Sequence, residues 1–288
     1  MTTKTKNIIL FPLNLLHRIS PKLTLKILFR LKTHHKLNLK NPVSFNEKLQ
    51  WVKLNYKNPL LPKLVDKYSV RDYIAAKAPE LLTKLYWQGF NANDIPWDEL
   101  PEKFVLKVTH GSSYNIICKD KNALDKKACA KKLNKWLKEK FLRCYGEWFY
   151  GIEKPRIIIE EFLDTKTGKV PDDYKVYCFN GKPEYVLLCT GRFEDTKSTM
   201  YDTNWVYQNV RLGYKSNSET PKPENLDELL KYAKLLCEDF PHVRVDLYNI
   251  NGKIYFGELT FTDGAGFDRI EPYDFDLKLG NLFKLKEF

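Results

Sequence analysis

Two acidic residues stand on what the sequence predicts to be neighbouring strands near the end of the chain. Asp246 lies in VRVDLYNI and Glu258 in KIYFGELTF, and the Asn-Gly pair between them is typical of a two-residue hairpin turn. Regular pairing around that turn places Asp246 opposite Gly257, so the two acids point to opposite faces unless a bulge shifts the register. Brought together, they would suit a Mg²⁺ ion that also holds phosphates. Acids with a purely structural role at a hairpin edge are the alternative.

A lysine and a glycine-serine turn follow each other further upstream, in FVLKVTHGSSYN. Lys107 stands at the end of an apolar strand, and Gly111, Ser112 and Ser113 come after it. Backbone amides freed by glycine, hydroxyl donors and a fixed ammonium group are what a triphosphate requires. The G-x-x-x-x-G-K-S/T spacing of a P-loop is absent, so the segment is not that motif. An ordinary hairpin between two strands is the alternative.

Charged residues also accompany three further strands. Glu160 and Glu161 close the apolar segment IIIEEFL, where they are either the solvated end of the strand or the partners of an adenine and its ribose. Lys175 in DYKVYCFN and Arg192 in CTGRF add two cations to Lys107. Several fixed cations around one cleft are suited to binding phosphate groups.

These residues depend on a mixed order of helices and strands. A capping box, in which Ser44 precedes Glu47 by three residues, predicts the start of a helix. Downstream, the patterns predict helices over 61–79, 124–141 and 226–240, and strands over 104–108, 156–163, 174–180, 184–191 and, as a hairpin, 243–260. Helices first, then strand–helix–strand, then mainly antiparallel strands with one helix, indicate the α+β class with parts that meet around a cleft.

The positive charge of the chain is concentrated at its start. The formal net charge is +12, yet residues 1–46 hold nine of the Lys and Arg and no acid. The remainder has the ordinary balance of a globular protein, so the basic composition does not predict nucleic-acid binding. The first segment lacks a small-residue cleavage site and is interrupted by Pro12 and Pro21. It therefore predicts neither a secretory signal nor a membrane span.

Ser20 and Pro21 predict the start of a helix by N-cap and first-turn chemistry. Two neighbouring rows of side chains then run along it, one formed by Lys22, Lys26 and Arg30 and the other by Leu23, Ile27 and Leu31. Two interpretations remain open. The helix packs on the body with a solvated basic edge, or residues 1–35 attach peripherally to an anionic membrane face or to a partner there.

The six cysteines form no C-x-x-C pair and have no nearby histidine. This usage predicts neither a zinc site nor a disulfide framework. Free thiols in a reducing cytoplasm are the expectation.

Taken together, these segments resemble the TupA-like branch of the ATP-grasp superfamily. The resemblance is carried by SFNEKLQWVKL, HGSSYN, IIIEEFL, DYKVYCFNGKP and VRVDLYNINGKIYFGELTF, and it extends from about residue 36 onward. It implies two α+β lobes that sandwich ATP, with an N-terminal helical segment. The implied divisions are a basic amphipathic helical segment at 1–45, a helical and α+β region at 46–98, a lid lobe at 99–160 and a catalytic lobe with an antiparallel sheet and the metal site at 161–288.

The resemblance also implies a role for each candidate residue. Lys107 and Lys175 would contact phosphates, and Gly111, Ser112 and Ser113 would form the lid loop. Adenine and ribose would be held by Glu160, Glu161 and the backbone at Phe162 and Leu163. Asp246 and Glu258 would bind Mg²⁺. Thr260 stands where many ATP-grasp enzymes have a metal-binding Asn, which leaves the second metal open.

The activity implied is that of an ATP-dependent carboxylate–amine ligase that uses ATP and Mg²⁺ and forms an acyl phosphate, with Lys107, Lys175 and Arg192 neutralising charge. Its substrates would be an amine and a carboxylate on a small molecule or polysaccharide, such as a uronic acid or a peptide, in bacterial capsule or cell-surface polysaccharide biosynthesis. We expect a cytoplasmic protein, and peripheral attachment at the inner face of the membrane through residues 1–35 remains one of the two open interpretations of that segment. A kinase acting on a sugar or metabolite hydroxyl is one alternative. A nucleotide-sugar glycosyltransferase is another, although Asp172 and Asp173 are adjacent rather than spaced as D-x-D.

Overall fold

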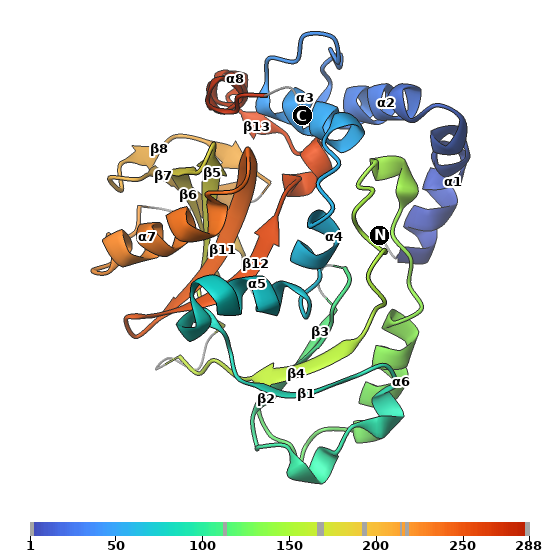
Figure 1. The fold of residues 1–288 in the computed structure, drawn as a ribbon, viewed down its shortest axis with the longest axis vertical. Coiled ribbons are helices and arrows are strands. Elements are labelled where there is room, and N and C mark those ends of the chain that lie inside the picture. Colours follow the sequence, from blue (N-terminus) through green and yellow to red (C-terminus); the bar gives the residue numbers. More distant parts are fainter. Residues whose placement is uncertain are drawn as a thin grey trace.

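A computed structural model of the chain describes residues 3–111, 114–165, 170–191, 195–213, 215–216 and 219–285, with the side chains of 3–8 and 215–216 excepted. Ser112, Ser113 and Arg192 lie outside the described residues. Two β-sheets lie on either side of the middle of the molecule, with helices around and between them (Figure 1). The prediction of the α+β class is confirmed.

The smaller sheet lies at the lower end of Figure 1. Its strands are antiparallel, in the order β1 (Leu85–Gly89), β4 (Ile157–Glu161), β2 (Phe104–Val108) and β3 (Asn115–Cys118). Helix α6 (Lys126–Trp136) packs on it through Leu133, which lies in one apolar cluster with Leu106 and Ile159. Helix α6 is shorter than the helix predicted over 124–141. The predicted boundaries of the lobes stay predictions.

The larger sheet holds seven strands in the described part of the chain, in the order β10-β7-β6-β5-β11-β12, with β8 beside β7. Their bounds are β5 Asp173–Phe179, β6 Lys182–Thr190, β7 Lys197–Asp202, β8 Tyr207–Gln208, β10 Lys215–Ser216, β11 His242–Ile250 and β12 Lys253–Thr260. A separate pair joins β9 (Arg211–Leu212) to β13 (Ile270–Glu271).

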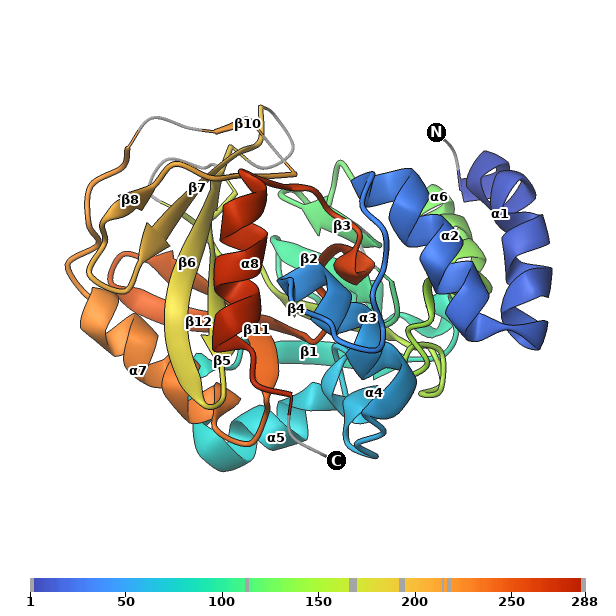
Figure 2. The ribbon, with the colours of Figure 1, turned by 90° about the horizontal axis from the view of Figure 1, so that it is seen from above.

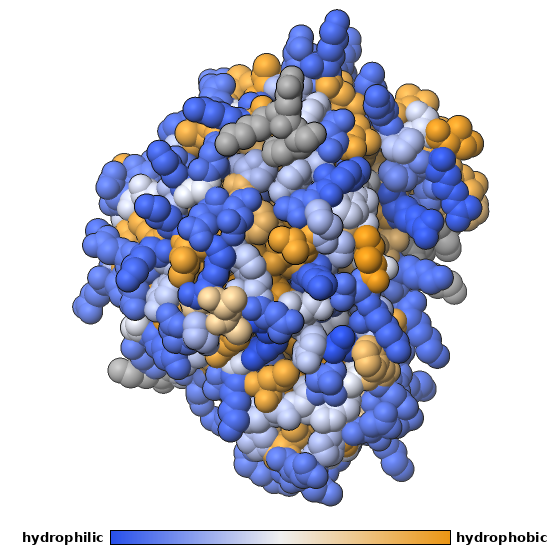
Figure 3. All heavy atoms as spheres, viewed as in Figure 1, coloured by the Kyte–Doolittle hydropathy of each residue, from blue (hydrophilic) through white to orange (hydrophobic). Residues whose placement is uncertain are grey.

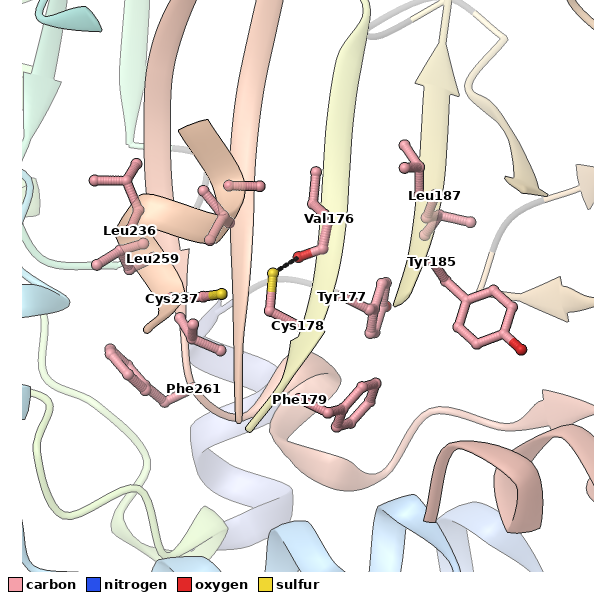
Figure 4. Close-up of a cluster of buried hydrophobic side chains, with 14 of the residues drawn as sticks. Val176, Tyr177, Cys178, Phe179, Tyr185, Leu187, Leu236, Cys237, Leu259 and Phe261 are labelled. Atoms are coloured by element: carbon pink, nitrogen blue, oxygen red, sulfur yellow. Dashed lines mark hydrogen bonds between the residues drawn. The ribbon is translucent and has the colours of Figure 1, made fainter. Parts of the chain in front are cut away.

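The two faces of the larger sheet are covered by different helices. Because side chains alternate along β5, Cys178 faces α7 (Leu226–Cys237), whereas Tyr177 and Phe179 point to the other face (Figure 4). There the rings of Tyr177 and Phe179 meet Phe45 of α3 (Phe45–Asn55), edge to face. Figure 2 shows α8 (Tyr273–Leu282) beside α3 on this side. Lys175 lies two positions before Tyr177 on β5, so its side chain also points away from α7.

The remaining helices precede the sheets or connect them. Ser20 caps α2 (Pro21–Thr33), which follows α1 (Thr3–Ile19), and the capping box of Ser44 and Glu47 opens α3 as predicted. Short 3₁₀ turns connect the other elements, at Pro79–Leu81, Ala92–Asp94, Trp97–Glu99, Arg143–Tyr145 and Asp263–Gly266.

The prediction of one helix over 61–79 is wrong. The segment forms α4 (Leu61–Leu64) and α5 (Val70–Lys77), separated by a turn. Within that turn, the Asp66 carboxylate accepts hydrogen bonds from the backbone N–H groups of Tyr68 and Ser69, at 3.0 and 2.9 Å. A short acidic side chain that binds nearby N–H groups competes with helix continuation.

All six cysteines are buried thiols rather than members of disulfides. No helix among the described residues is long and apolar enough to cross a membrane.

The hairpin of β11 and β12 contains the bulge that the two acids require. Leu247 pairs with Phe256, but the next pair joins Asp246 to Glu258, which leaves Gly257 as an extra residue. The shift places Asp246 and Glu258 directly opposite each other, on one face. A side chain at Gly257 would meet the carbonyl oxygen of Asp246 at 2.9 Å, so glycine is required by close approach.

We expect Gly257→Ala to lower the free energy of unfolding by about 1–3 kcal/mol, because the added methyl group forces the two strands apart at the bulge. Chemical denaturation followed by circular dichroism measures this. Lys253→Ala, at an exposed position of the same hairpin, is the control and should change stability by no more than about 0.5 kcal/mol. Equal stability of the two variants would mean that the bulge tolerates a side chain.

Candidate nucleotide and metal site

The main cleft of the described structure lies between the two sheets and has a volume of about 330 Å³. The smaller sheet and the segment after it contribute one wall, and β5, β11 and β12 contribute the other. Its lining includes Lys67, Lys107, Glu161, Phe162, Leu163, Lys175, Asp246 and Glu258. Seven of these eight are residues that the sequence singled out, and they come from segments far apart in the chain.

Lys107 lies on β2 and points toward Glu160 of the neighbouring strand β4. Its Nζ is 2.7 Å from Glu160 Oε2, and Arg71 Nη1 is 2.8 Å from Glu160 Oε1. The Thr83 hydroxyl also donates a hydrogen bond to the Glu160 carboxylate. Glu160 is only 5% exposed. Burial alone would raise the pKa of Glu160, but Lys107, Thr83 and Arg71 together lower it. Glu160 thus works as a buried anchor for Lys107, beside the cleft rather than in its lining.

Glu161, Phe162 and Leu163 do line the cleft, where β4 ends. Glu161 accepts a hydrogen bond from the backbone N–H of Lys84 at 2.8 Å. Apolar side chains, including Val105 and Phe256, surround the same space. A flat base could lie between these side chains with its polar edge toward the backbone after β4.

Gly111 and Lys67 stand together where β2 leads into the loop before β3. Gly111 has φ +85°, a conformation that favours glycine, and its carbonyl accepts a hydrogen bond from Lys67 Nζ at 2.9 Å. Lys67 precedes α5 and lines the cleft. Burial, the largest effect, lowers the pKa of Lys67 although Glu258 works in the opposite direction. Sequence reasoning missed Lys67, which sits in a turn without a recognisable phosphate motif.

Asp246 is the most strongly held acid of the site. It is 2% exposed. Arg244 donates two hydrogen bonds to its carboxylate, from Nε to Oδ1 and from Nη2 to Oδ2, each 2.7 Å long. Lys175 Nζ bonds the same carboxylate and lies 2.7 Å from Asp173 Oδ2. Burial opposes the charge of Asp246, but Arg244 and Lys175 hold its pKa below the ordinary value. The same acids raise the pKa of Lys175 against its burial.

Arg244 links Asp246 to the rest of the hairpin and to the turn that follows. Its Nη2 lies 3.4 Å from Glu258 Oε1 and 3.2 Å from Thr260 Oγ1, and its Nη1 pairs with Asp263. Sequence reasoning missed Arg244. The signal was present, because a residue two positions before Asp246 on a strand shares its face.

Asp246, Glu258 and Thr260 present oxygen atoms on one face of the hairpin, and both carboxylates line the cleft. Glu258 is the accessible partner, with its side chain 46% exposed. Within the residues described, no group of three or more His, Cys, Asp or Glu is arranged as a protein-only metal cage. Two carboxylates fit Mg²⁺, which is held in such sites by one or two protein oxygens together with substrate phosphates and water.

A second pocket of about 200 Å³ lies beside Lys175 and Arg244. Both cations line it, together with Asp173, Leu187, Cys189, Thr196, Leu212, Gly213, Asp263 and Asp268. Lys175 and Asp173 line the main cleft as well. Lys175 therefore lies between the two cavities, whereas Arg244 lines the second pocket. Ser112, Ser113 and Arg192, with their predicted roles, lie outside the described residues.

A family model for TupA-like ATP-grasp proteins matches residues 47–284, most of the chain. The chain belongs to the TupA-like ATP-grasp family. This confirms the predicted family and the ATP-grasp fold. No curated protein sequence matches the chain.

Three ligases are among the solved structures that match the chain, each with low sequence identity and a TM-score below 0.5. D-alanine–D-alanine ligase from Bacillus anthracis, complexed with ATP, has 15% sequence identity over 69% of this chain and 55% of that one, with a TM-score of 0.43. L-amino acid ligase from Bacillus licheniformis has 13% identity over 77% of this chain and 49% of that one, with a TM-score of 0.49. The ATP-grasp ligase PsnB, complexed with minimal precursor, Mg and ADP, has 13% sequence identity over 75% of this chain and 57% of that one. The TM-score is 0.38. This TupA-like chain thus spans about half the length of these structures, and the similarity describes the fold alone.

We expect Lys107→Met to weaken binding of a non-hydrolysable ATP analogue and also to lower the free energy of unfolding by about 1–3 kcal/mol. The stability loss follows because Glu160 stays buried with one of its two cations removed. The double variant Lys107→Met/Glu160→Gln should recover stability but not affinity. Calorimetric titration and denaturation separate the two effects, and unchanged affinity in the single variant would remove Lys107 from the nucleotide site.

The two acids of the hairpin should respond differently to loss of charge. Glu258→Gln should leave stability within about 0.5–1 kcal/mol, because its carboxylate is half-exposed and only weakly paired. Asp246→Asn should lower it by about 3 kcal/mol, because Arg244 and Lys175 would lose a buried partner. ATP turnover should fall by at least about a hundredfold in both variants, because we expect both carboxylates to hold the metal ion. Retained turnover in Glu258→Gln would mean that the acids are structural.

Proposed function

We propose that the chain is an ATP-dependent carboxylate–amine ligase. One observation carries the proposal: Lys175 lines both a cleft suited to a magnesium-bound nucleotide and a second pocket, which Arg244 lines as well. A carboxylate in the second pocket would meet the γ-phosphoryl group of ATP beside these two cations. Family membership supports the nucleotide part of the proposal.

The reaction has two steps. A carboxylate oxygen of the acceptor attacks the γ-phosphorus of ATP, ADP leaves, and an acyl phosphate forms. The nitrogen of an amine then attacks the acyl carbon, phosphate leaves, and an amide forms as the amine nitrogen loses a proton. Asp246 and Glu258 would hold Mg²⁺, whose charge would offset that of the phosphate oxygens. Lys107 and Lys67 would hold the phosphates from the small-sheet side, and Arg244 would align the acceptor carboxylate and steady the charge that develops on it.

The lining of the second pocket supports a chemical class for the acceptor. Two cations beside the second pocket suit a carboxylate such as that of a uronic acid or a peptide, and Asp263 and Asp268 at its wall suit the amine that arrives next. We infer a role in bacterial capsule or cell-surface polysaccharide biosynthesis, with a glycan or small-molecule carboxylate and an amine as substrates. A D-x-D metal site of a glycosyltransferase is not formed by Asp172 and Asp173, because Asp173 is 2% exposed and bound to Lys175.

Trapping of the acyl phosphate tests this directly. The chain is incubated with MgATP, hydroxylamine and a panel of uronic acids, amino acids and dipeptides, and hydroxamate and ADP are measured. We expect equal amounts of the two products with one class of carboxylate, and neither product with Glu258→Gln. Formation of ADP with a phosphorylated hydroxyl and no hydroxamate would establish a kinase instead.

A further inference from the structure

Helices α1 and α2 form a hairpin at one end of the molecule, joined at Ser20 (Figures 1 and 2). Their inner faces account for the packing. Leu25, Leu28 and Phe29 of α2 are at most 2% exposed and form an apolar cluster with Cys144 and Phe267. Leu10 and Leu13 of α1 pack against the same cluster. The outer faces are therefore not needed to hold the hairpin on the body.

The outer face of α1 is nevertheless apolar. Phe11, Leu15 and Ile19 follow one another at intervals of four, which places them on one side of the helix. They are 59%, 45% and 84% exposed. Figure 3 shows hydrophobic side chains along this outer edge of the molecule, at the upper right. Single exposed apolar residues are ordinary, but a continuous row of large ones marks an interaction surface.

The outer face of α2 adds positive charge next to this row. Lys22, Lys26 and Arg30 are exposed at intervals of four, and Leu23 and Leu31 beside them are 47% and 65% exposed. Lys22 and Leu23 lie in the first turn of α2, shortly after Ile19 ends α1. We call the exposed residues of both helices the N-terminal helical surface: Phe11, Leu15, Arg18, Ile19, Lys22, Leu23, Lys26, Arg30 and Leu31.

We propose that the N-terminal helical surface binds the face of an anionic lipid bilayer. Large apolar side chains beside Lys and Arg are the combination that inserts shallowly at the headgroup level while the cations meet lipid phosphates. A second copy of the chain is a poor occupant, because residues 1–46 contain no acid and two such surfaces would bring like charges together. The proposal concerns binding and does not depend on the ligase activity.

One consequence links this surface to catalysis and rests on the proposed function. A groove of about 370 Å³ begins where α2 ends, at Thr33, His34 and His35, and Asp268 lines both this groove and the second pocket. An acceptor displayed on a membrane beside α2 would approach the second pocket from this side.

Sedimentation with vesicles of phosphatidylcholine containing about 30% phosphatidylglycerol tests the proposal. The full chain should bind these vesicles, bind phosphatidylcholine alone much more weakly, and lose affinity as salt rises. Lys22→Glu/Lys26→Glu/Arg30→Glu should lower the affinity about a hundredfold. The control is Lys127→Glu/Lys131→Glu/Lys135→Glu on α6, which reverses the charge of three exposed lysines at the same spacing. Among the described residues, α6 has no exposed large apolar side chain. It should change affinity about threefold or less.

A second variant separates insertion from simple charge attraction. Phe11→Gln/Leu15→Gln/Ile19→Gln should abolish the binding that remains at high salt, and it should leave the melting temperature unchanged because these side chains are exposed. Equal loss of affinity in the α2 and α6 charge variants would overturn the proposal in favour of non-specific attraction. Absence of vesicle binding by the unaltered chain would overturn it as well, and ligase activity measured in solution would be unaffected by either outcome.

Discussion

The site depends on one buried carboxylate, Asp246, and on the two cations that keep it charged. Removing an acid from water is costly unless hydrogen bonds and opposite charges replace the water. Arg244 and Lys175 supply both, and each cation in turn has a further acid, Asp263 or Asp173. A network of this kind fixes the positions of its members, as the proposed phosphoryl transfer requires.

Other parts of the fold hold this network from outside. The bulge at Gly257 brings Glu258 opposite Asp246. The turn that carries Asp263 is fastened to α3, where Gln50 and Lys53 donate hydrogen bonds to the carbonyl of Ala265 at 3.1 and 2.8 Å. Lys53 is 1% exposed, and its burial lowers its pKa to about 7. Helix α3 therefore supports the candidate site, since it holds the turn whose Asp263 pairs with Arg244.

The sequence predicted the elements of the site better than their contacts. Local signals were sufficient for the capping box of α3, the strands around Lys107 and Lys175, and the hairpin of β11 and β12. The break between α4 and α5 was missed because Asp66 caps the turn with its own side chain, an effect that hydrophobic periodicity does not register. The anchoring role of Glu160 was also missed, because Arg71 and Thr83 reach it from distant segments and no local pattern encodes such a contact.

The central claim is that Asp246 and Glu258 jointly bind the metal of a metal–nucleotide complex. Manganese binding followed by electron paramagnetic resonance, in the presence of a non-hydrolysable ATP analogue, tests this without reference to any acceptor. Mn²⁺ prefers the same oxygen ligands as Mg²⁺. The account predicts that the unaltered chain removes Mn²⁺ from solution only when the analogue is present, and that Glu258→Gln, which should stay folded, does so much more weakly. Equal Mn²⁺ uptake by the two proteins would contradict it.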